Sequence, residues 1–287
     1  WVNTSVTQPR HATVNQPRIS PVIVLPAKMQ EGSLLRRDVI PFVGKVILNG
    51  AQGEQKQFTC VLAGRRKDAC VTTAHSFIEA GSQVVSRDAA GIATVYQEVS
   101  VEFEACEQMY AARSIDLGTT RIDPVTETDR EKDVAVITLA ATACESIDPA
   151  VLLPKLNKET ANKWLLPGAR ARVPVTISAY YQDCALGFEP SGTQEACEQY
   201  SSTGYIDSID SLGGEPIYES ISIGTLPGSS GAPGLVIDTG NDPLTRADDT
   251  YYWICLNVGH RPGGENACIA LENGSFARRF IEARIAF

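Results

Sequence analysis

The residues of this sequence that could do chemistry together are a serine, a histidine and an aspartate. Ser230 lies in the run GSSGAP over residues 228–233. A serine hydroxyl is a poor nucleophile unless a base removes its proton, so this loop calls for a histidine and a carboxylate elsewhere in the chain. His75 ends the short apolar run VTTAH over residues 71–75, and Asp133 begins the alternating run DVAVITL over residues 133–139. These two residues could serve as the base and as the carboxylate that orients it.

Each of the three runs also has a purely structural interpretation. Gly-Ser-Ser-Gly segments are common in turns, a histidine after a strand is often a structural residue, and an aspartate often precedes a strand. The order along the chain, however, is His75, Asp133, Ser230, which is the order of chymotrypsin and differs from those of subtilisin and the α/β-hydrolases. The sequence also lacks the Gly-x-Ser-x-Gly elbow around Ser230 that an α/β-hydrolase would need.

The three runs resemble, in the same order, the active-site segments of the trypsin-like serine peptidases. GSSGAP resembles Gly-Asp-Ser-Gly-Gly-Pro, VTTAH resembles Val-Thr-Ala-Ala-His, and DVAVITL resembles Asp-Ile-Ala-Leu-Leu-Lys-Leu. The resemblance implies that Ser230 is the nucleophile, His75 its general base and Asp133 the orienting carboxylate. It also implies an oxyanion hole made by the N–H groups of Gly228 and Ser230, with Gly228 in a φ region that disfavours side chains.

The function implied by this resemblance is that of a secreted trypsin-like serine endopeptidase that cleaves peptide bonds through an acyl-enzyme. Its partners would be protein or peptide substrates, it would need no metal or organic cofactor, and it would act as a monomer. Two alternatives stay open on the residues alone. One is a catalytically silent or latent protein of the same fold that binds or adheres, and the other is an acyl esterase that uses the same three residues.

Two residues next to the proposed catalytic residues depart from the family pattern. Ser229 stands where animal trypsin-like enzymes have an aspartate that pairs with a newly cut N-terminus, so that ion pair cannot form here. We therefore expect the loop around Ser230 to be formed already, as in many bacterial relatives. Ser76 stands where the family has a cysteine directly after the histidine, so the usual bridge from that loop is absent.

The positions that match the family's specificity pocket carry no acidic residue. Gly224 falls at the pocket floor, which argues against a preference for Lys or Arg at P1, the substrate residue before the cleaved bond. Thr225 matches a threonine of the glutamyl endopeptidases, but Asn257 replaces their wall histidine. We expect a neutral or polar P1 side chain, and the matching substrate-binding positions are Gly224, Thr225, Asn257, Val258 and Gly259.

Eight cysteines are present without any Cys-x-x-Cys pair, which argues against a zinc site. Their grouping along the chain predicts disulfides between neighbours. The predicted bonds are Cys60–Cys70, Cys106–Cys144, Cys184–Cys197 and Cys255–Cys268. Because disulfides persist in oxidising compartments, the chain is expected to be extracellular or periplasmic, with scattered buried thiols as the alternative.

Short β-branched runs separated by Gly and Asn turns predict an all-β fold. The resemblance implies two six-stranded antiparallel β-barrels with a C-terminal helix, as in chymotrypsin. Residues 39–150 would form the first barrel, with His75 and Asp133. Residues 151–287 would form a crossover, the second barrel with Ser230, and a helix capped by Ser275 whose apolar stripe continues to Ile285. Residues 1–38, which hold four prolines, are predicted to be an extended arm or pro-segment that ends beside a dibasic pair, a candidate processing site.

Composition excludes several other classes of protein. The chain has 287 residues and a net charge of −9, which argues against a nucleic-acid partner because phosphate binding needs a concentrated basic face. No apolar run approaches the length of a membrane span. The sequence starts at Trp1 without a secretory leader, which predicts a processed chain.

Overall fold

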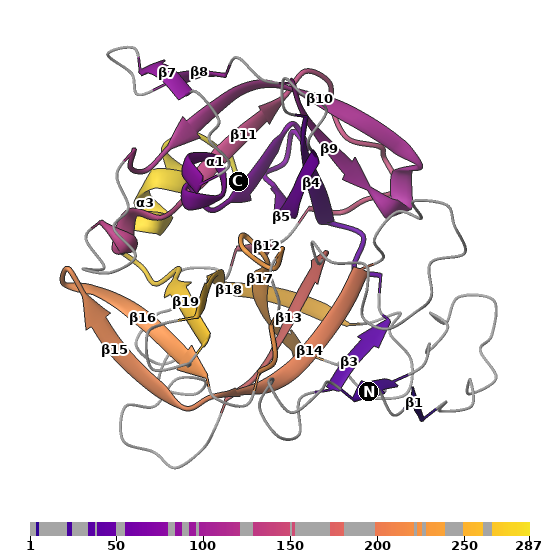
Figure 1. Ribbon diagram of the computed structural model, residues 1–287, viewed down its shortest axis with the longest axis vertical. Coiled ribbons are helices and arrows are strands. Elements are labelled where there is room, and N and C mark those ends of the chain that lie inside the picture. The colour runs from indigo at the N-terminus through magenta and orange to yellow at the C-terminus, as the bar shows by residue number, and fades with distance from the viewer. Residues whose placement is uncertain are drawn as a thin grey trace.

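A computed structural model of the chain describes residues 4–5, 22–24, 34–37, 39–49, 55–79, 84–87, 92–95, 98–120, 129–149, 151–152, 173–180, 199–220, 223–225, 228–238, 249–260 and 266–287. These residues form two large β-sheets and a few short helices. Figure 1 shows the first sheet, coloured indigo to magenta, in the upper half of the molecule and most of the second sheet, in orange and yellow, in the lower half.

The first sheet closes into a six-stranded antiparallel barrel. The strands follow the order β11-β6-β5-β4-β9-β10, and a pairing of β10 with β11 closes the circle. Alternate residues point inward and make a dense apolar core that includes Val46, Val71 and Val101. The barrel strands are β4 (Val43–Asn49), β5 (Gln55–Ala63), β6 (Ala69–Thr72), β9 (Glu98–Phe103), β10 (Gln108–Leu117) and β11 (Ala135–Leu139). Two further strands, β7 (Val84–Arg87) and β8 (Ile92–Val95), extend the sheet from β10.

The second sheet is built around six antiparallel strands in the order β14-β13-β17-β18-β19-β16. Its two ends approach each other where Asp207, just after β14, donates its N–H to the carbonyl oxygen of Glu219 in β16 at 2.9 Å. The six strands are β13 (Val173–Tyr180), β14 (Gln199–Ile206), β16 (Glu215–Ser220), β17 (Pro233–Asp238), β18 (Thr250–His260) and β19 (Asn266–Ala270). Strand β15 (Ser208–Leu212) forms a hairpin with β16, and strand β12 (Val151–Leu152) runs parallel to β18. The predicted all-β barrel architecture is confirmed.

Short N-terminal strands lengthen the second sheet. Strands β1 (Thr4–Ser5), β2 (Val22–Val24) and β3 (Leu34–Arg37) form an antiparallel series, and β3 pairs with β14 so that Arg37 faces Tyr200. The dibasic pair Arg36-Arg37, a candidate processing site from the sequence, therefore lies in a strand that is paired on both sides. Backbone pairing holds this part of the predicted arm on the second sheet.

The C-terminal helix returns to the first barrel. Helix α3 (Phe276–Glu282) begins after Ser275, whose hydroxyl accepts the N–H of Arg278 at 3.3 Å, and it buries Phe280 and Ile281. Both the cap and the apolar stripe were predicted and are confirmed. Arg65 then donates its N–H to the carbonyl oxygen of Ala286 at 3.0 Å, which fastens the chain end to the first barrel. In the part of the chain that the structure describes, no helix is long and apolar enough to span a bilayer.

The cysteines follow the predicted pattern in part. Disulfides join Cys106 to Cys144 and Cys255 to Cys268, as predicted, whereas Cys184 and Cys197 lie outside the described residues. The predicted Cys60–Cys70 bond is wrong, since both residues are free, buried thiols. They lie on the paired strands β5 and β6, where Cys70 faces Leu62. Their short spacing therefore reflects a hairpin whose inward side chains fill the barrel, a place that suits a small apolar thiol.

Candidate active site

The fold brings His75, Asp133 and Ser230 together from three separate elements. Strand β6 leads into α1 (His75–Glu79), and the short 3₁₀ helix η2 (Arg130–Lys132) leads through Asp133 into β11. Because β6 and β11 are antiparallel neighbours with Thr72 facing Ala135, the end of one strand and the start of the other lie at the same edge. Ser230 reaches this edge from the second sheet, just before β17.

Hydrogen bonds join the three side chains in one line. The Nδ1 atom of His75 lies 2.6 Å from Oδ2 of Asp133, and its Nε2 atom lies 2.8 Å from the hydroxyl oxygen of Ser230. The backbone N–H of His75 donates to Oδ1 of Asp133 at 2.8 Å, so both carboxylate oxygens hold the same residue. Asp133 is buried and His75 is 9% exposed, whereas Ser230 is partly exposed.

This geometry fixes the direction of the hydrogen bonds. An ionised carboxylate can only accept, so the ring proton of a neutral His75 lies on Nδ1 and points to Asp133. The other ring nitrogen, Nε2, is then an acceptor that faces the Ser230 hydroxyl. The arrangement can therefore take a proton from Ser230 and hold the resulting positive charge beside Asp133.

The loop that carries Ser230 is held by both sheets. Gly228 has a φ of 96°, in the region expected for it, and Gly231 has a φ of 83°. From the first barrel, the backbone N–H of Thr59 donates to the carbonyl oxygen of Ser230 at 3.1 Å. The Thr59 hydroxyl donates to the carbonyl oxygen of Gly228 at 2.9 Å. From the second sheet, Asn257 accepts the N–H of Gly231 at 2.9 Å.

Two backbone donors of this loop remain open. Among the described residues, neither the N–H of Gly228 nor that of Ser230 donates a hydrogen bond. These are the two groups that the sequence nominated for an oxyanion hole. Open N–H groups beside a hydroxyl that is itself bonded to a histidine can receive negative charge that develops near that hydroxyl.

The five nominated specificity residues lie on two segments, the irregular residues 223–225 after β16 and strand β18 of the second sheet. Gly224 donates its N–H to the Ser202 hydroxyl at 3.1 Å, and the Thr225 hydroxyl donates to Oδ1 of Asn266 at 2.5 Å. Asn257, Val258 and Gly259 follow one another in β18, where Asn257 is fully buried and Gly259 has a φ of 94°.

Sequence reasoning missed Thr59, which bonds the serine loop, and Asn266, which bonds Ile223 and Thr225. Thr59 stands inside an apolar strand, and Asn266 is more than thirty residues from the serine loop. No short motif marks either residue. In the described residues, no three histidine, cysteine or acidic side chains gather as a metal ion would require.

Comparison with known proteins identifies the fold. No protein-family model matches the sequence, and no curated protein matches it either. A solved Glu endopeptidase superposes with a TM-score of 0.51 at 14% identity, over 86% of this chain and 92% of that chain. A solved HL collagenase superposes with a TM-score of 0.53 at 13% identity, over 86% of this chain and 95% of that chain. With its closed barrel, second sheet and C-terminal helix, the chain has the fold of the chymotrypsin-like serine proteases.

Proposed function

We propose that this protein is a secreted serine endopeptidase that cleaves peptide bonds through an acyl-enzyme. The observation that supports the proposal most directly is the line of hydrogen bonds from Asp133 through His75 to Ser230. A partly exposed serine hydroxyl bonded to a buried imidazole, which is itself bonded to a buried carboxylate, is the arrangement that activates serine for acyl transfer.

Acylation uses each of these groups in turn. The Ser230 oxygen attacks the carbonyl carbon of the substrate while Nε2 of His75 takes the hydroxyl proton. Asp133 keeps the ring oriented and stabilises the imidazolium through its bond to Nδ1. The imidazolium then gives the proton to the leaving amine nitrogen, the peptide bond breaks, and the acyl group stays on Ser230.

Deacylation repeats the sequence with water. His75 takes a proton from the attacking water, and the Ser230 oxygen leaves with that proton as the acid product is released. In both steps the negative charge on the former carbonyl oxygen is received by the N–H groups of Gly228 and Ser230. Loss of one such donor typically raises the barrier by about 2.7–4 kcal/mol.

The substrates we propose are proteins with a neutral or polar P1 side chain. Gly224, at the position of the pocket floor, offers no charge, and the Thr225 hydroxyl is bonded to an uncharged amide of Asn266. A Lys or Arg side chain would find no carboxylate at these positions. The disulfides Cys106–Cys144 and Cys255–Cys268 support secretion, because such bonds persist in oxidising compartments.

Intact mass after treatment with a fluorophosphonate tests the proposal, since this reagent reacts with activated serine hydroxyls. We expect one adduct on the wild-type protein and none on Ser230→Ala. The matched control Ser208→Ala, which changes an exposed serine in β15, should keep the adduct. A folded wild-type protein that gains no adduct would contradict catalysis and favour a binding protein. Hydrolysis of ester substrates without any cleavage of peptides would favour an esterase.

A further inference from the structure

A buried asparagine in β18 forms hydrogen bonds with the loop that carries Ser230. The Asn257 side-chain amide Nδ2 donates to the carbonyl oxygen of Ser229 at 2.9 Å and lies 3.1 Å from the Ser229 hydroxyl oxygen. The backbone of Asn257 adds two bonds, since it accepts the N–H of Gly231 and donates its own N–H to the carbonyl of Ala232, both at 2.9 Å. One residue thus contacts the loop on both sides of Ser230.

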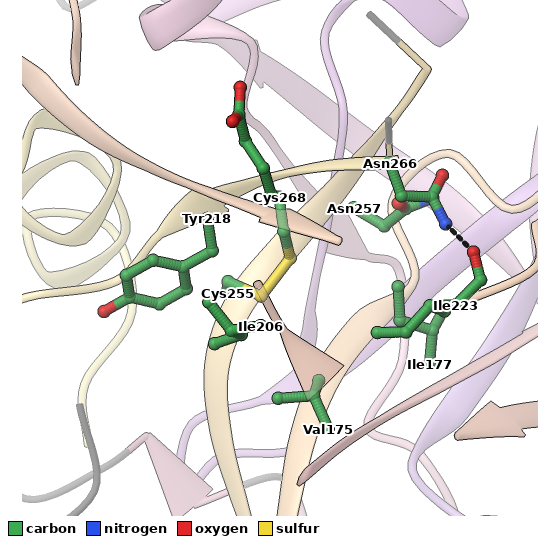
Figure 2. A pocket seen from close by; sticks show the side chains of 10 residues that line it. Val175, Ile177, Ile206, Tyr218, Ile223, Cys255, Asn257, Asn266 and Cys268 are labelled. Atoms are coloured by element: carbon green, nitrogen blue, oxygen red, sulfur yellow. Dashed lines mark hydrogen bonds between the residues drawn. A yellow bond between two sulfur atoms is a disulfide. The ribbon is translucent and has the colours of Figure 1, made fainter. Parts of the chain in front are cut away.

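The orientation of this amide follows from its partners. A carbonyl oxygen can only accept, so the atom that faces the Ser229 carbonyl is the amide nitrogen. The amide oxygen, Oδ1, is then buried without a hydrogen-bond partner among the described residues. Asn257 lines a small internal cavity with Ile177, Ile223 and Asn266, as Figure 2 shows.

An unpartnered buried oxygen is unfavourable for stability. A leucine side chain has a similar shape to asparagine and would occupy the same space without that oxygen. Packing therefore gives no reason for an amide at this position, whereas its two contacts with Ser229 do. Ser229 is itself 3% exposed, so its bonds to Asn257 form away from solvent.

We propose that Asn257 is a positioning residue that keeps the Gly228–Gly231 loop ready to receive an oxyanion, without any charged partner. This inference rests on the proposed function and names the group that keeps the loop formed. Ser229 and Asn257 are both uncharged, so the loop is fixed by neutral hydrogen bonds, and a newly cut α-amine would find no counter-charge in this pair.

Asn257→Leu is the variant that tests this role. Its fold should survive, because the Ser229 carbonyl keeps the N–H of Ala232 as a donor at 3.0 Å, and the unpartnered oxygen disappears. We expect kcat per titrated active site to fall about 10- to 100-fold with KM changed less than about threefold, because misplaced oxyanion donors weaken the transition state more than substrate binding. The second-order rate constant of fluorophosphonate labelling should fall by a similar factor.

Two further variants separate positioning from general loosening of the sheet. Ile177→Val removes a methyl group from a side chain that lines the same cavity and forms no hydrogen bond with the loop, so it should lower Tm without changing kcat. Ser229→Ala removes only the 3.1 Å contact, so its effect on kcat should be smaller than that of Asn257→Leu. In the double variant the two effects should not add, because they report the same interaction.

The pH profile distinguishes a loop held by neutral hydrogen bonds from a loop held by an ion pair. A loop held by an α-ammonium loses its anchor as that amine deprotonates, ordinarily near pH 8. Because Asn257 and Ser229 carry no charge, we expect the wild-type kcat/KM to stay level between about pH 8 and pH 10. A fall across this range that Asn257→Leu retains would indicate that an ionised amine holds the loop, and it would overturn the proposal.

Hydrogen exchange tests the loop independently of catalysis. In Asn257→Leu, the hydrogen-bonded backbone amides of Gly231 and Ala232 should exchange at least about tenfold faster, with the first-barrel strands unchanged. Unchanged exchange together with unchanged kcat would overturn the role of Asn257. A wild-type protein that never reacts with the fluorophosphonate would overturn the proposed function instead, and the exchange experiment would still decide whether Asn257 holds the loop.

Discussion

The backbone N–H of Thr59, in the first barrel, donates at 3.1 Å to the carbonyl oxygen of Ser230, in the loop that leads into β17 of the second sheet. The Thr59 hydroxyl lies 2.9 Å from the Gly228 carbonyl oxygen, and it accepts the N–H of Tyr180, the last residue of β13, at 2.9 Å. A single strand residue thus joins the two sheets at the serine loop. His75 follows a strand of the first barrel and Ser230 precedes a strand of the second sheet, so the distance between them depends on junctions of this kind.

The Thr59 hydroxyl is expected to matter for both stability and catalysis. Thr59→Val keeps the shape of the side chain but removes a bonded partner from the buried Tyr180 N–H and Gly228 carbonyl. Each buried group left without a partner costs about 1–3 kcal/mol, so we expect a clear fall in the free energy of unfolding. We also expect kcat to fall about tenfold because the loop shifts relative to His75. Urea unfolding and steady-state kinetics check the two effects.

Thr176→Val is the matched control for this change. Thr176 pairs its hydroxyl with that of Thr203 at 2.8 Å on neighbouring strands of the second sheet, and neither hydroxyl contacts the serine loop. Its loss should lower stability by about 1 kcal/mol and leave kcat unchanged. Equal kcat values for Thr59→Val and the wild type would show that the junction does not position the loop.

Asp133 is expected to be essential for orienting His75. Its two oxygens accept two N–H groups of His75, one from the ring and one from the backbone. An asparagine at this position would offer only one acceptor oxygen, so its NH₂ group would face a donor and favour the wrong ring tautomer. We expect Asp133→Asn to lower kcat by about 10⁴ with the fold retained, as seen when a serine-peptidase triad is changed in this way. A loss below about tenfold would remove Asp133 from the mechanism.

Activity is expected to fall on acidification. Protonated His75 cannot take the proton of Ser230, and histidines in proteins usually change charge between about pH 5 and 8. The rate of fluorophosphonate labelling should therefore be highest in neutral and mildly alkaline solution and should decrease as the pH is lowered through that range. A rate that stays constant from about pH 5 to 8 would contradict a histidine base.

The sequence predicts the parts of this protein that depend on local patterns. The short apolar run that ends at His75 and the alternating run that begins at Asp133 each predict a strand, and the structure has β6 and β11 at these places. Strand β10 was not predicted, because a bulge between Ala112 and Ser114 breaks its alternation: Tyr110 is buried before it, and Ile115 after it.

Polar residues in the core explain most of what the sequence did not reveal. Strand β14 buries Ser201 and Ser202 and was not recognised, since small hydroxyl residues suggest a loop. Thr59 and Asn257 are likewise buried, and each acquires its role only when the other sheet or the serine loop approaches it. Such contacts depend on distant parts of the chain, so no local pattern can indicate them.

The two free thiols are expected to be inert in the folded protein. Burial, together with the hydrogen bond and charge of Cys60, raises the pKa of the Cys70 thiol, so the reactive thiolate is scarce at neutral pH. Iodoacetamide should modify Cys60 and Cys70 only after unfolding, without any need for a reductant. Mass spectrometry of digests should find the four bonded cysteines modified only after reduction. A linked peptide pair containing Cys60 and Cys70 would contradict the free thiols.

Gly231 is expected to tolerate no side chain because a Cβ atom there would clash with its neighbours. A comparison with Gly214 separates this clash from the effect of the backbone conformation. A Cβ atom at Gly231 would lie 2.1 Å from the Thr72 hydroxyl oxygen and 2.2 Å from the Thr59 carbonyl oxygen, at a φ of 83°. Gly214, in the β15–β16 turn, has nearly the same φ of 84°, but a Cβ atom there would meet nothing within 4 Å. Gly214→Ala should therefore lower the free energy of unfolding by only about 1–2 kcal/mol, the cost of placing a side chain at a positive φ.

Gly231→Ala should lower the free energy of unfolding by the same amount and by about 3 kcal/mol or more in addition. The added loss arises because the Thr59 carbonyl belongs to a barrel strand and cannot move aside. Since Ser230 is the adjacent residue, the displacement should also abolish fluorophosphonate labelling in any folded fraction, whereas Gly214→Ala should label at the wild-type rate. Chemical denaturation gives the first comparison and intact mass the second. Similar stability losses in the two variants would mean that the serine loop can withdraw from Thr59, and the close junction of the two sheets would then not hold the loop in place.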